Sequence, residues 1–141
     1  SDEIEKNNDS QSQVINKNQQ HQRILLVEDN KINQLIATRL LESLGLTVDV
    51  AQDGYEAIAA VNENEYLVVL MDIQMPKMGG VEATIELRKT YSPEQLIIIA
   101  LTANVTSAEI DYYMSIGMNR HLGKPYEIVK IKEVLMNYYH C

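Results

Sequence analysis

The stretch Tyr66-Leu-Val-Val-Leu-Met-Asp72 decides the fold. Six apolar residues in a row have the length of a β-strand, and a strand that is apolar on both faces belongs in the middle of a parallel sheet. The run ends abruptly at a carboxylate, and Pro76 follows in a turn that cannot be helical in its middle. We therefore predict a central strand over residues 66–71 that delivers Asp72 to the edge of a sheet.

Four more strands are predicted on either side of this one. Residues 24–27 and 95–101 are apolar on both faces and belong near the centre, whereas residues 46–51 alternate as an edge strand does, and a short strand is expected at about 119–122. The segments between these strands have apolar residues at helical spacing. Five strands alternating with five helices predict one α/β domain, a doubly wound (βα)5 fold with a parallel sheet.

Helix ends and helix faces follow from the same residues. Asn30 is predicted to cap the first helix and Gly45 to end it, while Thr106 and Glu109 form a capping box for the helix that ends near Gly117. The last helix is expected over about residues 126–139. Spacing predicts that the following side chains face the sheet: Ile32, Leu35, Ile36 and Leu40 in the first helix, and Val81 and Ile85 in the helix at about 80–89.

The first 22 residues differ in composition from the rest of the chain. Asn and Gln predominate, and only Ile4, Val14 and Ile15 are aliphatic. Such a stretch buries too little apolar surface to offset the entropy of ordering it. We expect residues 1–22 to be a flexible tail or linker and residues 23–141 to form the domain.

Composition excludes several classes of partner. Twenty acidic residues against 12 basic ones give the 141-residue chain a net charge of −8, which argues against nucleic acid or anionic membranes at the domain surface. The apolar runs are too short to span a bilayer, and the N-terminus lacks a signal peptide's apolar core. The single cysteine, Cys141, allows no internal disulfide and favours a reducing compartment. We expect a cytoplasmic domain.

Polar side chains cluster at the predicted strand ends. Glu28 and Asp29 follow the first strand, Asp72 ends the third, Thr102 ends the fourth, and Lys124 follows the fifth. Function in such sheets concentrates beyond the carboxyl ends of the strands, where the strand order reverses. Any one of these residues could be an ordinary cap or surface group, but five at strand ends indicate a site.

The residue types suggest which chemistry this site supports. Three clustered carboxylates repel one another and require a cation, and oxygen ligands without His or Cys favour Mg²⁺. A carboxylate held beside Mg²⁺ and an ammonium group is a plausible phosphoryl acceptor. The hydroxyl of Thr102 could then bond a phosphoryl oxygen and act as a switch.

Four segments resemble the receiver domain of two-component response regulators, in the family's order and spacing. They are Ile24-Leu-Leu-Val-Glu-Asp-Asn30, Val69-Leu-Met-Asp-Ile-Gln-Met-Pro76, Ile99-Ala-Leu-Thr-Ala103 and Leu122-Gly-Lys-Pro125. The likeness covers residues 23 to about 140 and is greatest to receivers of hybrid sensor histidine kinases. It implies a flavodoxin-like sheet with strand order 2-1-3-4-5.

The resemblance also implies a role for each matching residue. Asp72 would accept a phosphoryl group from a phosphohistidine-bearing kinase or phosphotransfer domain. Thr102 and Lys124 would hold the phosphoryl oxygens, and Lys124-Pro125 would be a cis bond of structural importance. Asp72 and Asp29 would bind Mg²⁺ directly, Glu28 mainly through water, and Gln74 through its backbone carbonyl.

Three positions are expected to tune the signal. His121 stands where the family often has Tyr or Phe, so it is either a surface histidine or an imidazole that moves inward with Thr102 when the domain is phosphorylated. Gln74 and Asn104 border the expected path of hydrolytic water and should tune the phosphate lifetime. The output surface implied by the family comprises the helix at about 106–117, the strand at about 119–122 and the last helix.

The sequence also allows other functional interpretations. A pseudo-receiver would work by unphosphorylated contacts. A hydrolase with an aspartyl-phosphate intermediate would typically need an acid where Gln74 stands, so turnover of a separate substrate is not expected. The chain could be a stand-alone regulator, but its Asn/Gln-rich tail and missing Met favour a piece of a hybrid kinase, in the cytoplasmic part of a sensor. We expect a monomer or weak dimer.

Overall fold

The computed structural model describes residues 22–140. The predicted tail lies outside the described residues except for Gln22. The carbonyl of Gln22 accepts a hydrogen bond of 3.0 Å from the amide of Thr47, and its side chain donates one of 3.2 Å to the carbonyl of His140. These bonds join Gln22 to the body of the domain.

Strands and helices alternate along the whole described chain, as the sequence predicts. The strands are β1 (Arg23–Val27), β2 (Thr47–Ala51), β3 (Val68–Asp72), β4 (Ile97–Thr102) and β5 (Arg120–Gly123). The helices are α2 (Lys31–Ser43), α3 (Gly54–Glu63), α4 (Gly80–Arg88), α5 (Ser107–Ser115) and α6 (Ile128–Leu135).

The five strands form one parallel sheet in the order β2-β1-β3-β4-β5. Leu26 of β1 pairs with Leu70 of β3, which pairs in turn with Ile99 of β4. All five residues of β3 are buried, so the strand predicted as central is central, and the alternating strand β2 lies at an edge. The predicted fold class and strand order are confirmed.

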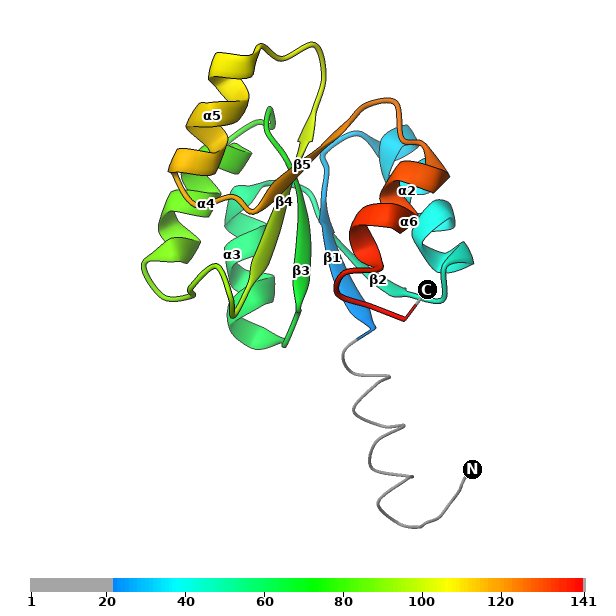
Figure 1. Cartoon of the computed structure of the whole chain (residues 1–141). Helices are drawn as coiled ribbons and strands as arrows, with labels where there is room; N and C mark the ends of the chain where they lie inside the picture. Colours follow the sequence, from blue (N-terminus) through cyan, green and yellow to red (C-terminus); the bar gives the residue numbers. More distant parts are fainter. Residues whose placement is uncertain (1–21, 141) are drawn as a thin grey trace.

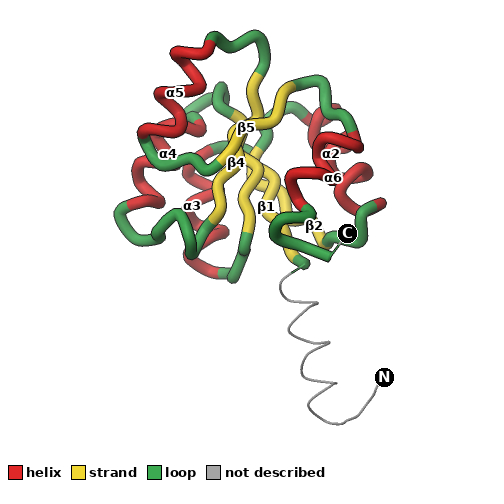
Figure 2. Tube along the Cα trace, in the orientation of Figure 1, coloured by secondary structure: helices red, strands yellow, loops and turns green. Residues whose placement is uncertain are grey.

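Helices cover both faces of the sheet (Figure 1). Helices α3, α4 and α5 lie on one face, and α2 and α6 lie on the other; Figure 2 shows the strands sandwiched between them. Alternate strand residues therefore enter two cores: Val69 and Ile98 pack with the first group of helices, and Leu70 and Ile99 with the second. This layering explains why the central strands are apolar on both faces.

Local signals set most helix ends. The side chain of Asn30 accepts a hydrogen bond of 2.9 Å from the amide of Asn33, and Thr106 and Glu109 form the complete predicted capping box. Gly45 and Gly117 follow α2 and α5 with φ angles of 91° and 113°, which favour glycine.

The predicted inward faces of two helices are wrong in part: Leu40 of α2 and Val81 of α4 pack against the cores as predicted, but the other four side chains do not. Ile32, Leu35 and Ile36 of α2 are 69%, 52% and 46% exposed, and Ile85 of α4 is 43% exposed. Helix α2 instead buries Ala37 and Leu41, and α4 buries four residues: Gly80, Ala83, Thr84 and Leu87. Ala37 and Leu41 are four residues apart and share one face of α2, and burial of this face leaves the large aliphatic side chains of the neighbouring face exposed.

The last helix is shorter than predicted. It begins after Glu127 and ends at Leu135, and residues 136–138 form turns. Tyr126 lies in the loop that follows the cis Lys124–Pro125 bond. Within residues 22–140, no helix combines the length and the apolar character needed to cross a bilayer.

Candidate functional site

The parallel sheet brings the carboxyl ends of all its strands to one edge, the upper edge in Figure 1. The strand order reverses between β1 and β3, and the neighbouring loops border a cleft of about 360 Å³. Seven of the residues singled out from the sequence line it: Glu28, Asp29, Asp72, Gln74, Thr102, Asn104 and Lys124. His121 and Pro125 do not.

Three carboxylates meet in this cleft. Glu28, Asp29 and Asp72 each offer one oxygen, and these atoms lie within 4.8 Å of one another. Glu28 and Asp72 are only 1% and 6% exposed, whereas Asp29 is open to solvent. A compact set of oxygen donors with one open side fits a hard divalent cation that keeps part of its water shell. Mg²⁺ commonly binds to proteins in this way.

Lys124 bridges two of the carboxylates. Its Nζ atom lies 3.1 Å from Oε1 of Glu28 and 3.1 Å from Oδ2 of Asp72. The backbone holds the lysine in place, because its amide donates a hydrogen bond of 2.7 Å to the carbonyl of Thr102. One ammonium group is thus shared between two buried acids.

The environment separates the acidities of these groups. Burial, followed by the neighbouring charge of Glu28, raises the pKa of Asp72 to about 6, although Lys124 opposes the shift. Burial would also raise the pKa of Glu28, but hydrogen bonds from the Asn30 amide, Tyr126 and Lys124 outweigh it and lower the pKa. For Lys124, burial is outweighed by its bonds and attraction to the two carboxylates, so its pKa is raised. Of the two buried carboxylates, Glu28 and Asp72, the charge of Asp72 is the less well compensated.

Sequence reasoning missed Tyr126. Its hydroxyl donates a hydrogen bond of 2.9 Å to Oε1 of Glu28, a residue 98 positions earlier in the chain. Burial, and then the charge of Glu28, raise the pKa of Tyr126 far above its usual value, so the hydroxyl remains a donor. Its place directly after the Lys124-Pro125 pair was the only signal in the sequence.

Thr102 and His121 lie on neighbouring strands. Thr102 is 4% exposed, and its hydroxyl donates a hydrogen bond of 3.3 Å to the carbonyl of Leu122. His121 is exposed, whereas the next residue, Leu122, is buried, because successive side chains of a strand point to opposite faces. In this structure the imidazole therefore lies at the surface.

The loops after β3 and β4 complete the cleft. Gln74 and Asn104 are both exposed, and Asn104 has a φ angle of 53°, a left-handed conformation that asparagine tolerates. On the far side, the Lys124–Pro125 bond is cis, as the resemblance implies. Gly80, at the start of α4, packs so closely on the backbone oxygen of Asp72 that a Cβ atom would collide with it.

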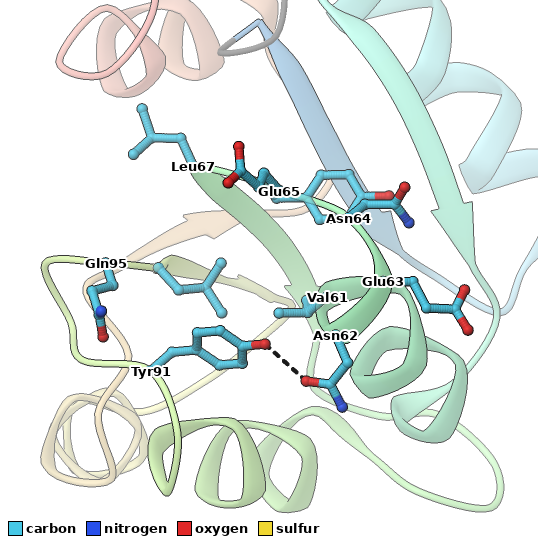
Figure 3. Close-up of a pocket in the computed structure, with 10 residues that line it drawn as sticks. Val61, Asn62, Glu63, Asn64, Glu65, Leu67, Tyr91 and Gln95 are labelled. Carbon is cyan, nitrogen blue, oxygen red and sulfur yellow. Dashed lines mark hydrogen bonds between the residues drawn. The ribbon is translucent and has the colours of Figure 1, made fainter.

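A second, larger pocket of about 510 Å³ lies at the opposite edge of the sheet. It is lined by the end of α3, the segment that leads into β3 and the segment that precedes β4 (Figure 3). The hydroxyl of Tyr91 points at Asn62 and donates a hydrogen bond of 2.8 Å to it. Glu63 and Glu65 extend in different directions in Figure 3, and no lysine, arginine or histidine lines the pocket. The candidate site is therefore the smaller cleft.

Several solved structures share this architecture. The receiver domain of sensor histidine kinase PA1611 from Pseudomonas aeruginosa PAO1, solved with a magnesium ion coordinated in its active site cleft, is 36% identical and covers 84% of this chain and 97% of that one, with a TM-score of 0.76. The receiver domain of Ssk1 from Saccharomyces cerevisiae, co-crystallised with the histidine phosphotransfer signalling protein Ypd1, is 28% identical, with a TM-score of 0.74 and coverage of 82% and 87%.

The chain is also similar in sequence to parts of curated proteins. Hybrid signal transduction histidine kinase B of Dictyostelium discoideum is 39% identical over 126 residues, which cover 82% of this chain and 6% of the kinase. The chain spans between 6 and 16% of the length of four curated relatives that it matches, three of which are named as histidine kinases. The model of the response regulator receiver domain matches residues 24–136. This chain therefore belongs to the response regulator receiver domain family of two-component systems and is homologous to the receiver domains of hybrid histidine kinases.

Proposed function

We propose that this domain accepts a phosphoryl group on Asp72 from a phosphohistidine donor and passes the signal on through a change in its surface. One observation carries the proposal: Asp72 lies with two further carboxylates around one cleft, and Lys124 contacts it from the side. This combination supplies a nucleophile, a site for a divalent cation and a fixed positive charge.

The chain's own residues are suited to hold Mg²⁺. Asp29 and Asp72 would bind it directly, Glu28 mainly through water, and Gln74 through its backbone carbonyl. When bound, the ion supplies positive charge that offsets the charge on the phosphoryl oxygens. The raised pKa of Asp72 supports this proposal, because a carboxylate that lacks compensating charge favours a cation nearby.

Transfer exchanges one bond for another. A carboxylate oxygen of Asp72 forms a bond to phosphorus while the bond between phosphorus and the donor's histidine nitrogen breaks, and the nitrogen keeps the electron pair. Lys124 can follow the new phosphoryl group, since its ammonium already lies 3.1 Å from Asp72. Thr102 can reach a phosphoryl oxygen only by giving up its present bond to the carbonyl of Leu122.

This exchange at Thr102 would be the switch. Withdrawal of the hydroxyl from β5 changes the strand that carries His121, and we propose that the surface formed by α5, β5 and α6 relays the change. As part of the same proposal, the imidazole of His121 turns inward when the domain is phosphorylated. Gln74 and Asn104, at the mouth of the cleft, would set how fast water removes the phosphoryl group.

The donor needs a surface beside the cleft, and α2 offers one. Asn30 and Asn33 line the cleft at the start of this helix, and the exposed aliphatic side chains of Ile32, Leu35 and Ile36 continue from them. An apolar face next to the acceptor would let a phosphohistidine domain bury its own apolar surface while presenting the histidine. The complex of Ypd1 with the Ssk1 receiver is a precedent for such a partner.

Incubation with acetyl phosphate and Mg²⁺ tests the acceptor. Mass spectrometry should find one added phosphoryl group on the wild-type domain, and none on D72N or after chelation of Mg²⁺. Asp111→Asn is the matched control, because it removes the same charge from an exposed position on α5. Phosphorylation of D72N at wild-type level would refute the proposal.

The docking surface is tested with a second donor. Leu35→Glu should slow transfer from a phosphohistidine domain that phosphorylates the wild type, and leave phosphorylation by acetyl phosphate unchanged. Equal loss with both donors would mean that the substitution damages the cleft rather than docking. We further propose that the domain works in the cytoplasm as part of a hybrid histidine kinase, where an ATP-dependent kinase core can supply the phosphohistidine.

A further inference from the structure

Tyr126 makes a contact that the proposed function does not use. It lies half-buried between β5 and α6, and its hydroxyl donates a hydrogen bond of 2.9 Å to Oε1 of Glu28. Glu28 is 1% exposed, so bulk solvent contributes little to its hydrogen bonding. A buried carboxylate that loses a donor becomes costly to keep ionised.

The donors around Glu28 are unevenly distributed. Oε1 accepts from Tyr126 and lies 3.1 Å from the ammonium of Lys124, whereas Oε2 accepts only the amide of Asn30, at 3.2 Å. A carboxylate has roughly four acceptor positions, two on each oxygen. Both positions on Oε1 are thus occupied, and one on Oε2 remains for a water molecule or an ion.

Lys124 cannot serve Glu28 in every state. The same ammonium contacts Asp72, and it has to follow the phosphoryl group when Asp72 is modified. After that movement Tyr126 is the one side chain in the described structure that still donates to Oε1. The orientation of Glu28 then depends on the tyrosine hydroxyl.

We propose that Tyr126 is a positioning residue that fixes the orientation of Glu28 for cation binding and frees Lys124 to follow the phosphoryl group. The proposal rests on the magnesium site described under Proposed function. Removal of the hydroxyl leaves Lys124 as the one side chain of the described structure that donates to Oε1 of Glu28, so this oxygen must compete with Asp72 for one ammonium. The cation then meets a less well-ordered ligand set.

Magnesium affinity, measured by calorimetric titration without a phosphodonor, tests this role. Tyr126→Phe keeps the ring and removes only the hydroxyl; we expect the Kd for Mg²⁺ to rise about tenfold, the lower end of what loss of an outer-sphere partner typically causes. Tyr66→Phe is the matched control. Tyr66 is also buried and donates its hydroxyl to a carboxylate, that of Asp49 at 2.6 Å, but it precedes β3 at the other end of the sheet. Removal of the Tyr66 hydroxyl should leave the Kd for Mg²⁺ within twofold of the wild-type value.

A double variant separates positioning from general stability. In a Glu28→Gln background, Tyr126→Phe should no longer change the affinity, since the carboxylate that it orients is gone. If the wild type binds no Mg²⁺ at millimolar concentration, the proposed function fails. If the wild type binds and Y126F binds equally well or more tightly, the role of Tyr126 is refuted and the proposed function stands.

A measurement on the wild type covers the case in which Y126F does not fold. The hydroxyl proton of Tyr126 should be visible by NMR and stay protected from exchange at saturating Mg²⁺, because the bond to Glu28 persists in the loaded site. Loss of this signal on addition of Mg²⁺ would overturn the proposal.

Discussion

Replacement of Asp72 by asparagine should stabilise the domain in the absence of Mg²⁺. Asp72 is 6% exposed, and its charge is opposed by burial and by Glu28 more strongly than Lys124 supports it. Asparagine has nearly the same shape and still offers Lys124 an acceptor oxygen, but it carries no charge. The substitution thus removes a repulsive interaction while keeping the packing.

The size of the effect follows from the pKa of Asp72, which rises from 3.8 to about 6 on folding. A group whose pKa is raised in the folded state stabilises fully below its unfolded pKa, and that contribution disappears as the pH rises through the folded pKa. About two units correspond to roughly 2–3 kcal/mol. D72N should therefore gain less than ~1 kcal/mol over the wild type near pH 4 and roughly 2–3 kcal/mol above pH 7.

Urea denaturation followed by circular dichroism measures this difference. Both proteins are compared at pH 4, 5, 6 and 8 in the presence of EDTA. Asp111→Asn, with an exposed carboxylate, should change the free energy of unfolding by less than ~0.5 kcal/mol at each pH. Mg²⁺ should then stabilise the wild type more than D72N.

Two results would refute the reasoning. D72N could be no more stable than the wild type at pH 8, which would mean that Lys124 fully compensates the charge of Asp72. Alternatively, the gain could be the same at pH 4 and pH 8, and it would then not come from ionisation of Asp72.

Three further substitutions test how the scaffold supports the site, each by urea denaturation at pH 7.5. Gly80→Ala should destabilise by about 1–3 kcal/mol, because the new methyl group would collide with the backbone oxygen of Asp72. Arg88→Met should cost about 2–3 kcal/mol, since Arg88 donates 2.8 Å hydrogen bonds to the carbonyl of Gly117 and to Asn119. Thr106→Ala should cost about 1 kcal/mol by removing the cap of α5.

Each expectation has an outcome that contradicts it. If Gly80→Ala had the same free energy of unfolding as the wild type, α4 would be able to shift away from β3 without destabilising the domain. A neutral Arg88→Met would show that water can replace the guanidinium beneath the loop before β5. A Thr106→Ala variant with an unchanged free energy of unfolding would show that solvent already satisfies the first turn of α5.

The fold and most of the candidate site could be predicted from the amino-acid sequence. Apolar runs that end in acids define both strands and strand ends, because a parallel strand covered on two faces tolerates few polar residues and its carboxyl end lies at the functional edge. Asp72, Asp29 and Lys124 could be singled out in this way. Caps such as Asn30 are equally readable, since they act within four residues of chain.

Only the tertiary structure decided which face of each helix is buried. Ile32, Leu35 and Ile36 have the spacing of an inward stripe, but the structure buries the neighbouring face that carries Ala37 and Leu41. Periodicity identifies side chains that share a face, but it does not choose between two neighbouring faces.

The same holds for contacts between distant segments. Tyr126 meets Glu28 across 98 residues, and Lys124 lies between Glu28 and Asp72, because α6 and β5 return to the edge where β1 and β3 end. The donors of a buried carboxylate depend on angles and distances that the whole fold sets. The sequence therefore indicates which groups gather at the cleft. The packed structure sets which of them share a partner, and it leaves Asp72 with less compensating charge than Glu28.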